Sequence, residues 1–391
     1  MRVAIISTAF FESTLPLFKY LYDDKTIDID LYCLFYNRFL NCPGFDMSNL
    51  NFTVKKDIEA ISNSYVPDYL LDYLGESEKN MYVYVYKFSI NYLFGYENSL
   101  AKDIEIKNYD VIHFIGFSTL YIPISKIVKS KLVLSLHESN IGRIKTNYMF
   151  KNIIRRIISD TQLRIINKIN YFTFFSENEK YNFINNYPKF KYCTTVIKFG
   201  LFETYQFIKT QSNIIDNGDY ILFLGLIREY KGVQFLIDTI NNSNQLSSNK
   251  FIIAGKNEIG IKSDNQNIKI IDKFLLDHEM VSLIKNCKFL VLPYLSASQS
   301  GLPSLALQFS KPLIFSDISG LHEYLTDNYN GIMFESGNNE SLLTAILKMN
   351  ETAVYNNLVL NIKTEPFNNR ISWLDSKNKM IDVYKELFNN Y

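Results

Sequence analysis

Short runs of apolar residues alternate along the chain with longer amphipathic stretches. The short runs have the length of buried strands, and the longer stretches have the apolar spacing of helices. In the first half we expect strands at Val3–Ile6, Ile29–Phe35, Val111–Phe114, Leu132–Leu136 and Tyr171–Phe175, and helices at Leu15–Tyr22, Ile153–Ile169 and Glu177–Asn185. This alternation is typical of βα units and predicts a parallel sheet.

A second set of the same pattern begins near Gly218. It predicts strands at Tyr220–Leu224, Phe251–Ala254, Phe289–Pro293 and Leu313–Phe315, and helices at Val233–Asn241, Met280–Asn286 and Asn339–Lys348. The stretch between the two sets, Gly200–Asn217, is polar and lacks a clear period, so we expect a linker there. The expected fold class is α/β, with two Rossmann-like doubly wound domains whose ligands bind beyond the carboxyl ends of the strands.

Length and charge narrow the class of protein. A chain of 391 residues with 47% hydrophobic and 21% charged residues suits two globular domains. The 41 Lys and Arg nearly cancel the 40 Asp and Glu, so the net charge of +1 gives no reason to expect a nucleic-acid partner. The first residues lack the features of a signal peptide, no apolar run has the length of a membrane span, and the four cysteines are scattered. We therefore expect a cytoplasmic location.

Two cations follow the first strand of the second half. The segment Tyr220–Val233 reads as a buried strand ending at Gly225, a loop with Arg228 and Lys231, and a helix after Gly232. Arg grips phosphate oxygens in a fork and Lys acts as a mobile point charge, so the pair suits a diphosphate. Two solvated loop cations in front of a helix would give the same spacing.

Small residues precede a helix in the segment Ser296–Ala306. Pro303 suits the first turn of that helix, and the backbone N–H groups of Ser300, Gly301 and Leu302 would then face an anion. An ordinary capped helix is the alternative. Two cations and a helix N-terminus on one sheet together favour a pyrophosphate.

These segments stand within a longer run of motifs that resembles the GT-B glycosyltransferases of the retaining group called family 4, or group 1. The matching segments are Gly225–Gly232, Ile253–Gly255, Val291–Tyr294, Gln299–Gly301, Lys311–Pro312, Ser316–Glu323 and Asn330–Phe334, with looser matches at Asp110–His113, Leu134–His137 and Val196–Gly200. The resemblance implies an acceptor domain over 1–200, a linker over 201–217 and a nucleotide-sugar domain over 218–370. A closing helix over 371–391 would pack back on the first domain.

The same resemblance assigns the donor site. Arg228 and Lys231 would neutralise the diphosphate, helped by the amides at 300–302. The nucleobase pocket would be lined by Ala254, Gly255, Lys256, Phe274 and Leu275, and Glu323 would lie near the cleft, unless it only interacts with a helix dipole. No metal is expected, because the cations and the helix terminus supply the electrostatic stabilisation, and no other cofactor is implied.

The sequence departs from the family at its pair of glutamates, one near the donor sugar and one on the ribose. Anchored on Gly301, the two positions hold Ser298 and Ala306, and no carboxylate occurs between Tyr294 and Ser316. We expect serines such as Ser296, Ser298 or Ser304 to make these contacts. Whether the anomeric configuration is retained or inverted therefore stays open.

The acceptor side is expected in the first half. By the resemblance, His137 lies close to the transferred sugar, where a neutral imidazole can accept a hydrogen bond or relay a proton; a histidine that merely closes a strand is the alternative. Glu138 follows it. The loop after the first strand, which includes Thr8 and Phe10, would shape the acceptor pocket in place of the family's glycine-rich loop.

Seven cations over residues 143–168 are interleaved with apolar residues and face a lone Asp160. Such a stretch can bind an anionic membrane surface, or it can be a domain helix with a solvated basic face. Binding at the inner face of the cytoplasmic membrane would suit a lipid-linked glycan acceptor in capsule or lipopolysaccharide assembly. We expect hexosyl transfer to a glycan or lipid-linked glycan. The alternatives are a catalytically silent partner of another glycosyltransferase, an inverting GT-B enzyme and a sugar-nucleotide epimerase.

Overall fold

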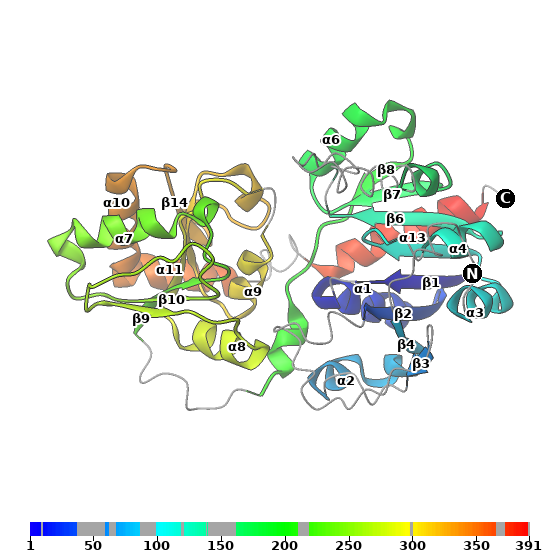
Figure 1. Ribbon diagram of the computed structural model, residues 1–391, viewed down its shortest axis with the longest axis horizontal. Coiled ribbons are helices and arrows are strands. Elements are labelled where there is room, and N and C mark those ends of the chain that lie inside the picture. Colours follow the sequence, from blue (N-terminus) through cyan, green and yellow to red (C-terminus); the bar gives the residue numbers. More distant parts are fainter. Residues whose placement is uncertain are drawn as a thin grey trace. The chain divides into compact units, whose positions relative to one another are not determined.

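The computed structural model describes residues 1–8, 11–36, 59–61, 68–86, 99–118, 121–137, 139, 162–209, 219–297, 300–364 and 372–389. These residues form two compact units, each built on its own sheet (Figure 1). The first unit takes in the described residues up to Gly200 together with helix α13 (Trp373–Asn389). The second unit contains the described residues from Leu201 to Ser372.

The sheet of the first unit is parallel except at one edge. Its strands are β1 (Arg2–Ser7), β2 (Asp28–Tyr36), β3 (Glu59–Ile61), β4 (Met81–Tyr86), β5 (Val111–Ile115), β6 (Lys131–Leu136), β7 (Tyr171–Phe174) and β8 (Thr194–Val196). They lie in the order β3-β4-β2-β1-β5-β6-β7-β8, and only β3 pairs antiparallel, with β4. The direction of winding reverses between β1 and β5, which creates a topological switch point.

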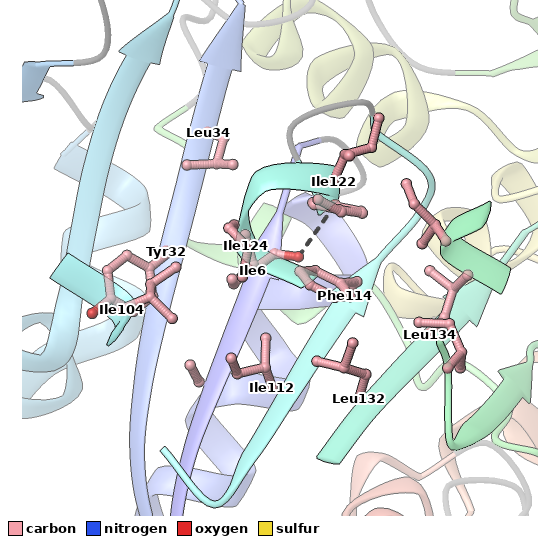
Figure 2. Packing of buried hydrophobic residues seen from close by; sticks show 14 of the residues in the cluster. Ile6, Tyr32, Leu34, Ile104, Ile112, Phe114, Ile122, Ile124, Leu132 and Leu134 are labelled. Carbon is pink, nitrogen blue, oxygen red and sulfur yellow. Dashed lines mark hydrogen bonds between the residues drawn. The ribbon is translucent and has the colours of Figure 1, made fainter. Parts of the chain in front are cut away.

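Alternate strand positions of this sheet build its main core. Figure 2 shows Ile6, Ile112, Phe114 and Leu134 on one face, together with Ile122, which lies on a covering helix. The covering helices on this face are α3 (Ser99–Lys107), α4 (Tyr121–Ile127) and α6 (Glu177–Asn186). Because successive side chains of a strand point to opposite faces, this pattern leaves the other face to different helices.

Helices α1 (Phe11–Asp24) and α13 pack on that other face (Figure 1). They contact each other, and Lys377 of α13 forms an ion pair with Asp24 of α1 at 2.5 Å. A further helix, α2 (Asp68–Leu74), precedes β4. The last helix of the chain is thus an integral part of the first unit, on the evidence of its contacts within that unit.

The sheet of the second unit is parallel throughout. Its strands are β9 (Tyr220–Leu224), β10 (Lys250–Ala254), β11 (Ile268–Ile271), β12 (Phe289–Leu292), β13 (Leu313–Ser316) and β14 (Gly331–Phe334). They lie in the order β11-β10-β9-β12-β13-β14. This is the strand order of dinucleotide-binding folds, and its switch point lies between β9 and β12.

The helices of the second unit are α7 (Val233–Asn241), α8 (Asp277–Asn286), α9 (Leu302–Gln308), α10 (Asn339–Asn350) and α11 (Thr352–Lys363). The described part of the segment expected as a linker, residues 201–209, also belongs to this unit. It contains the short turn of helix η6 (Glu203–Phe207), in which Tyr205 is buried. The α/β class with two Rossmann-like sheets, predicted from the sequence, is confirmed.

Candidate functional site

The loops after β9 and β12 touch at the switch point of the second unit. The first loop passes through helix η7 (Glu229–Lys231) to Gly232, whose φ of 65° is left-handed. A Cβ atom at Gly232 would lie 1.8 Å from the Pro293 carbonyl oxygen, so only glycine permits this approach. The close approach brings Lys231 onto the ring of Tyr294, with the Nζ atom 3.6 Å from the ring centroid.

The amine of Lys231 has an unusually low pKa for a lysine in a loop. Burial and the nearby Arg228 cation lower the pKa of Lys231 to about 8. Among the described residues, no carboxylate forms an ion pair with its amine; the ring of Tyr294 faces it instead. A partly buried cation without an acidic partner is suited to receive an anion.

Arg228, the second predicted phosphate ligand, is paired within the protein. Its Nε donates to Glu258 Oε2 at 2.6 Å and its Nη2 donates to Glu258 Oε1 at 3.0 Å. Glu258 and the Tyr230 side chain raise the pKa of the guanidinium. The two cations lie close enough for Arg228 to lower the pKa of Lys231, so the structure brings together the pair that the sequence predicted.

The loop after β10 lies at the same carboxyl edge of the sheet as the loops after β9 and β12. Gly255 has a φ of 148°, and a Cβ atom there would lie 1.9 Å from the Gly225 carbonyl oxygen. Lys256 forms an ion pair with Asp272 at 3.0 Å, after the end of β11. The predicted nucleobase residues therefore follow adjacent strands. Of these residues, Phe274 is about half exposed, whereas Ala254 and Leu275 are buried.

The segment before α9 lies next to Tyr294. Burial raises the pKa of Tyr294 to about 12, and the nearby Ser300 side chain opposes this shift. Pro303 stands in the first turn of this seven-residue helix. A Cβ atom at Gly301 would come within 3.0 Å of the Phe202 ring, from the segment at 201–209. Leu302 begins the helix and is partly buried. The predicted anion-binding segment thus lies beside the Lys231–Tyr294 pair.

The remaining predicted donor-side residues are Ser304, Ser298 and Glu323. Ser304 is fully buried, and so is Ala306, the position where the family's ribose carboxylate would stand. Ser298 lies outside the described residues. Glu323 follows helix η9 (Ser319–Leu321) after β13, and burial together with the Glu323 charge raises the pKa of the neighbouring Tyr324. The expected donor contacts of these residues stay predictions.

The acceptor-side residues lie on the first unit. Thr8 follows β1, next to the switch point, while Phe10 and Glu138 lie outside the described residues. His137 follows β6, and its ring packs against Phe175 and Phe199 at centroid distances of 4.4 Å and 5.3 Å. Burial lowers the pKa of His137 to about 3, so the imidazole is neutral at physiological pH. A neutral imidazole is the form that the sequence argument required.

A buried carboxylate holds the loop that follows His137. Glu179, in the first turn of α6, accepts a hydrogen bond from the Ser139 backbone N–H at 2.6 Å. Ser176 caps the same helix by accepting from the Glu179 backbone N–H at 3.1 Å. Sequence reasoning did not single out Glu179, because its partner lies in another βα unit.

The basic stretch at 143–168 lies mostly outside the described residues. Its described end is helical over 162–166, and Ile165, Ile166 and Ile169 are buried in the core of the first unit. At this end, the apolar side of the helix therefore packs inside the protein while Arg164 is exposed. None of the described helices combines the length and the apolar character needed to cross a bilayer.

No three His, Cys, Asp or Glu side chains gather into a possible metal site within the described ranges. That the reaction needs no metal stays a prediction.

Solved structures of known proteins share this two-sheet architecture over their whole length. Sucrose-phosphate synthase from Thermosynechococcus elongatus aligns with a TM-score of 0.61 at 11% identity, over 100% of both chains. The Anabaena protein HepE in complex with UDP-glucose aligns with a TM-score of 0.59 at 15% identity, over 99% of this chain and 100% of that one. The fold is that of the GT-B glycosyltransferases.

The sequence comparisons show similarity to glycosyltransferases, chiefly over the second unit. Residues 218–351 match the family described as glycosyl transferases group 1. An uncharacterised glycosyltransferase of Methanocaldococcus jannaschii is 30% identical over 181 residues. That match covers 44% of this chain and spans half the length of the archaeal protein. The resemblance read from the motifs is confirmed.

Proposed function

We propose that this chain transfers a hexose-type sugar from a nucleotide-sugar donor to a glycan or lipid-linked glycan. The observation that carries the proposal is the placement of Lys231 at the switch point between β9 and β12, with Tyr294 and Arg228 beside it. Ligands of doubly wound sheets bind at this point. A diphosphate is the ligand whose charge matches the two cations.

The chemistry follows from the same residues. When the glycosidic bond to the donor phosphate breaks, negative charge grows on the leaving nucleoside diphosphate. Lys231 and Arg228 would stabilise that charge in the transition state, because both cations would then lie against the leaving phosphate oxygens. The edge formed by Gly255, Lys256 and Phe274 would receive the nucleoside. HepE, which shares the fold, has been solved with UDP-glucose.

On the acceptor side we propose His137 as the group nearest the reacting centre, in its neutral form. For the acceptor we propose a growing surface polysaccharide, such as a capsule or lipopolysaccharide, assembled in the cytoplasm or at the inner face of the membrane. The support is the basic stretch at 143–168. Because its described end packs into the core, any membrane contact would depend on residues 143–161.

A thermal-shift screen against nucleoside diphosphates tests the donor site. A ligand that binds only the native state at about 100 times its Kd adds about 2.7 kcal/mol to the free energy of unfolding. We expect at least one of the uridine, adenosine, guanosine, cytidine and thymidine diphosphates to raise the melting temperature. The matching nucleotide sugar should then release its diphosphate when acceptor is supplied.

The variant Lys231→Ala serves as the control, because it removes the amine that the proposal places on the diphosphate. A screen in which no diphosphate stabilises the protein, or in which Lys231→Ala responds like the parent, contradicts the donor site. Tight diphosphate binding without release of product from any donor would instead identify a catalytically silent partner of another glycosyltransferase.

A further inference from the structure

The ion pair between Arg228 and Glu258 occupies two guanidinium donors that could bind a phosphate. The Glu258 carboxylate accepts a hydrogen bond from Arg228 Nε at 2.6 Å and a second one from Arg228 Nη2 at 3.0 Å. A phosphate group of a donor diphosphate would use the same fork, since carboxylate and phosphate oxygens match it equally. The carboxylate and the diphosphate therefore compete for one set of donors.

Backbone hydrogen bonds position Glu258 next to the loop that carries Arg228. The Ile227 N–H donates to the Lys256 carbonyl at 2.9 Å, and the Glu258 N–H donates to the Ile227 carbonyl at 3.1 Å. The Asn257 side chain closes the turn by bonding both the N–H and the carbonyl of Ile261. These bonds place the Glu258 backbone beside the loop that carries Arg228, within reach of the guanidinium.

The two cations of the site thus have different partners. Arg228 has a carboxylate partner, whereas Lys231 faces the Tyr294 ring and has no carboxylate partner among the described residues. The Arg228 hydrogen bonds lower the pKa of the Glu258 carboxyl, which therefore stays ionised at neutral pH. Both partners of the pair are about two-fifths exposed, so water can replace the pair at small cost.

We propose that Glu258 is a built-in competitor of the donor diphosphate, which must displace this carboxylate from Arg228 in order to bind. The proposal rests on the donor site proposed above. Glu258 would weaken the binding of the nucleotide and thereby favour release of the nucleoside diphosphate after transfer, when the carboxylate returns to Arg228.

The test is calorimetric titration of the parent and of Glu258→Gln with uridine diphosphate, or with the diphosphate that the thermal-shift screen selects. Low ionic strength is used, since salt screens exposed charges. Removing one partner of an exposed ion pair should tighten diphosphate binding by about two- to fivefold. Glu229→Gln is the matched control, because it removes one negative charge next to Arg228 in the chain, where Glu229 is exposed and forms no ion pair among the described residues.

Tighter binding in Glu258→Gln with a smaller change in Glu229→Gln supports the competitor. Weaker binding in Glu258→Gln would overturn it and would mean that the carboxylate positions Arg228. An equal gain in both variants would also overturn it, because net charge alone would then explain the effect. Binding in the parent with no gain refutes the competitor alone, whereas no binding in either protein refutes the donor site as well. Unchanged melting temperatures show that both variants fold.

Discussion

The amine of Lys231 packs against an aromatic ring, whereas most lysines in loops extend into water. The Nζ atom lies 3.6 Å from the centroid of Tyr294 and 5.4 Å from that of Tyr230, which gives the charge a partial cation–π stabilisation. Burial and the nearby Arg228 cation act in the opposite direction and lower the pKa of Lys231 to about 8. The residue is therefore charged at neutral pH and loses its charge in mildly alkaline solution.

Diphosphate binding should weaken above pH 8 for this reason. A bound anion raises the pKa of Lys231, so affinity is fully present below about pH 8 and is lost as pH rises through that value. The loss amounts to at most about tenfold per pH unit. Calorimetric titration with uridine diphosphate between pH 7 and pH 9.5 measures it.

Lys231→Arg should flatten this profile, because a guanidinium stays charged throughout the range. A parent protein whose affinity is constant up to pH 9.5 would show that Lys231 does not contact the diphosphate. At a fixed pH of 7, Lys231→Ala should lose about 1.5–3 kcal/mol of binding free energy, the usual size of a hydrogen bond to a charged group.

At the scale of elements, helix α13 is attached to the sheet of the first unit by a buried polar chain. The Tyr384 hydroxyl bonds His113 Nδ1 at 2.7 Å, and His113 Nε2 bonds the Ser135 hydroxyl at 2.6 Å. Ser135 in turn bonds Thr173 at 2.5 Å. Burial lowers the pKa of His113 to about 3, so its ring is neutral and donates through one nitrogen only.

Tyr384→Phe should destabilise the first unit. The substitution leaves the buried Nδ1 atom of His113 without the Tyr384 hydroxyl, which costs about 1–3 kcal/mol. Urea unfolding followed by circular dichroism measures the change in the free energy of unfolding. Tyr181→Phe is the control, because this side chain is 65% exposed and its loss should change little. Equal stabilities for Tyr384→Phe and the parent would show that packing alone holds α13.

At the scale of the whole molecule, the residues assigned to the donor and to the chemistry lie on different units. The diphosphate ligands follow strands of the second sheet, and His137 follows β6 of the first. If these assignments hold, donor affinity and turnover should respond to different substitutions, because the proposed diphosphate ligands belong to one unit and His137 belongs to the other.

His137→Ala should lower turnover by about a hundredfold or more while diphosphate affinity stays near the parent value. His137→Phe keeps the ring between Phe175 and Phe199 and removes the nitrogens, so it separates chemistry from packing. Product release is measured by chromatography, and NMR of the product shows whether the configuration is retained. Normal turnover in both variants would leave His137 a structural residue.

Local patterns of the sequence determined the class of fold and part of the site. Apolar periodicity is a property of neighbouring residues, so strands such as β9 and β12 were predicted close to their observed bounds. Helices were predicted less well at their starts: α1 begins at Phe11 and α8 at Asp277, because polar residues in a first turn carry no apolar signal. Arg228 and Lys231 were found because both lie in one loop between a strand and a helix.

The tertiary structure alone decided which groups surround these residues. Glu258 and Tyr294 follow β10 and β12, and they reach Arg228 and Lys231 only because those strands flank β9 in the sheet. Likewise, the aromatic packing of His137 joins the ends of separate strands. Strand order is set by how the whole sheet closes its core, a cooperative property that no local window of sequence contains. The sequence therefore named the cations, and the fold determined their charge states and partners.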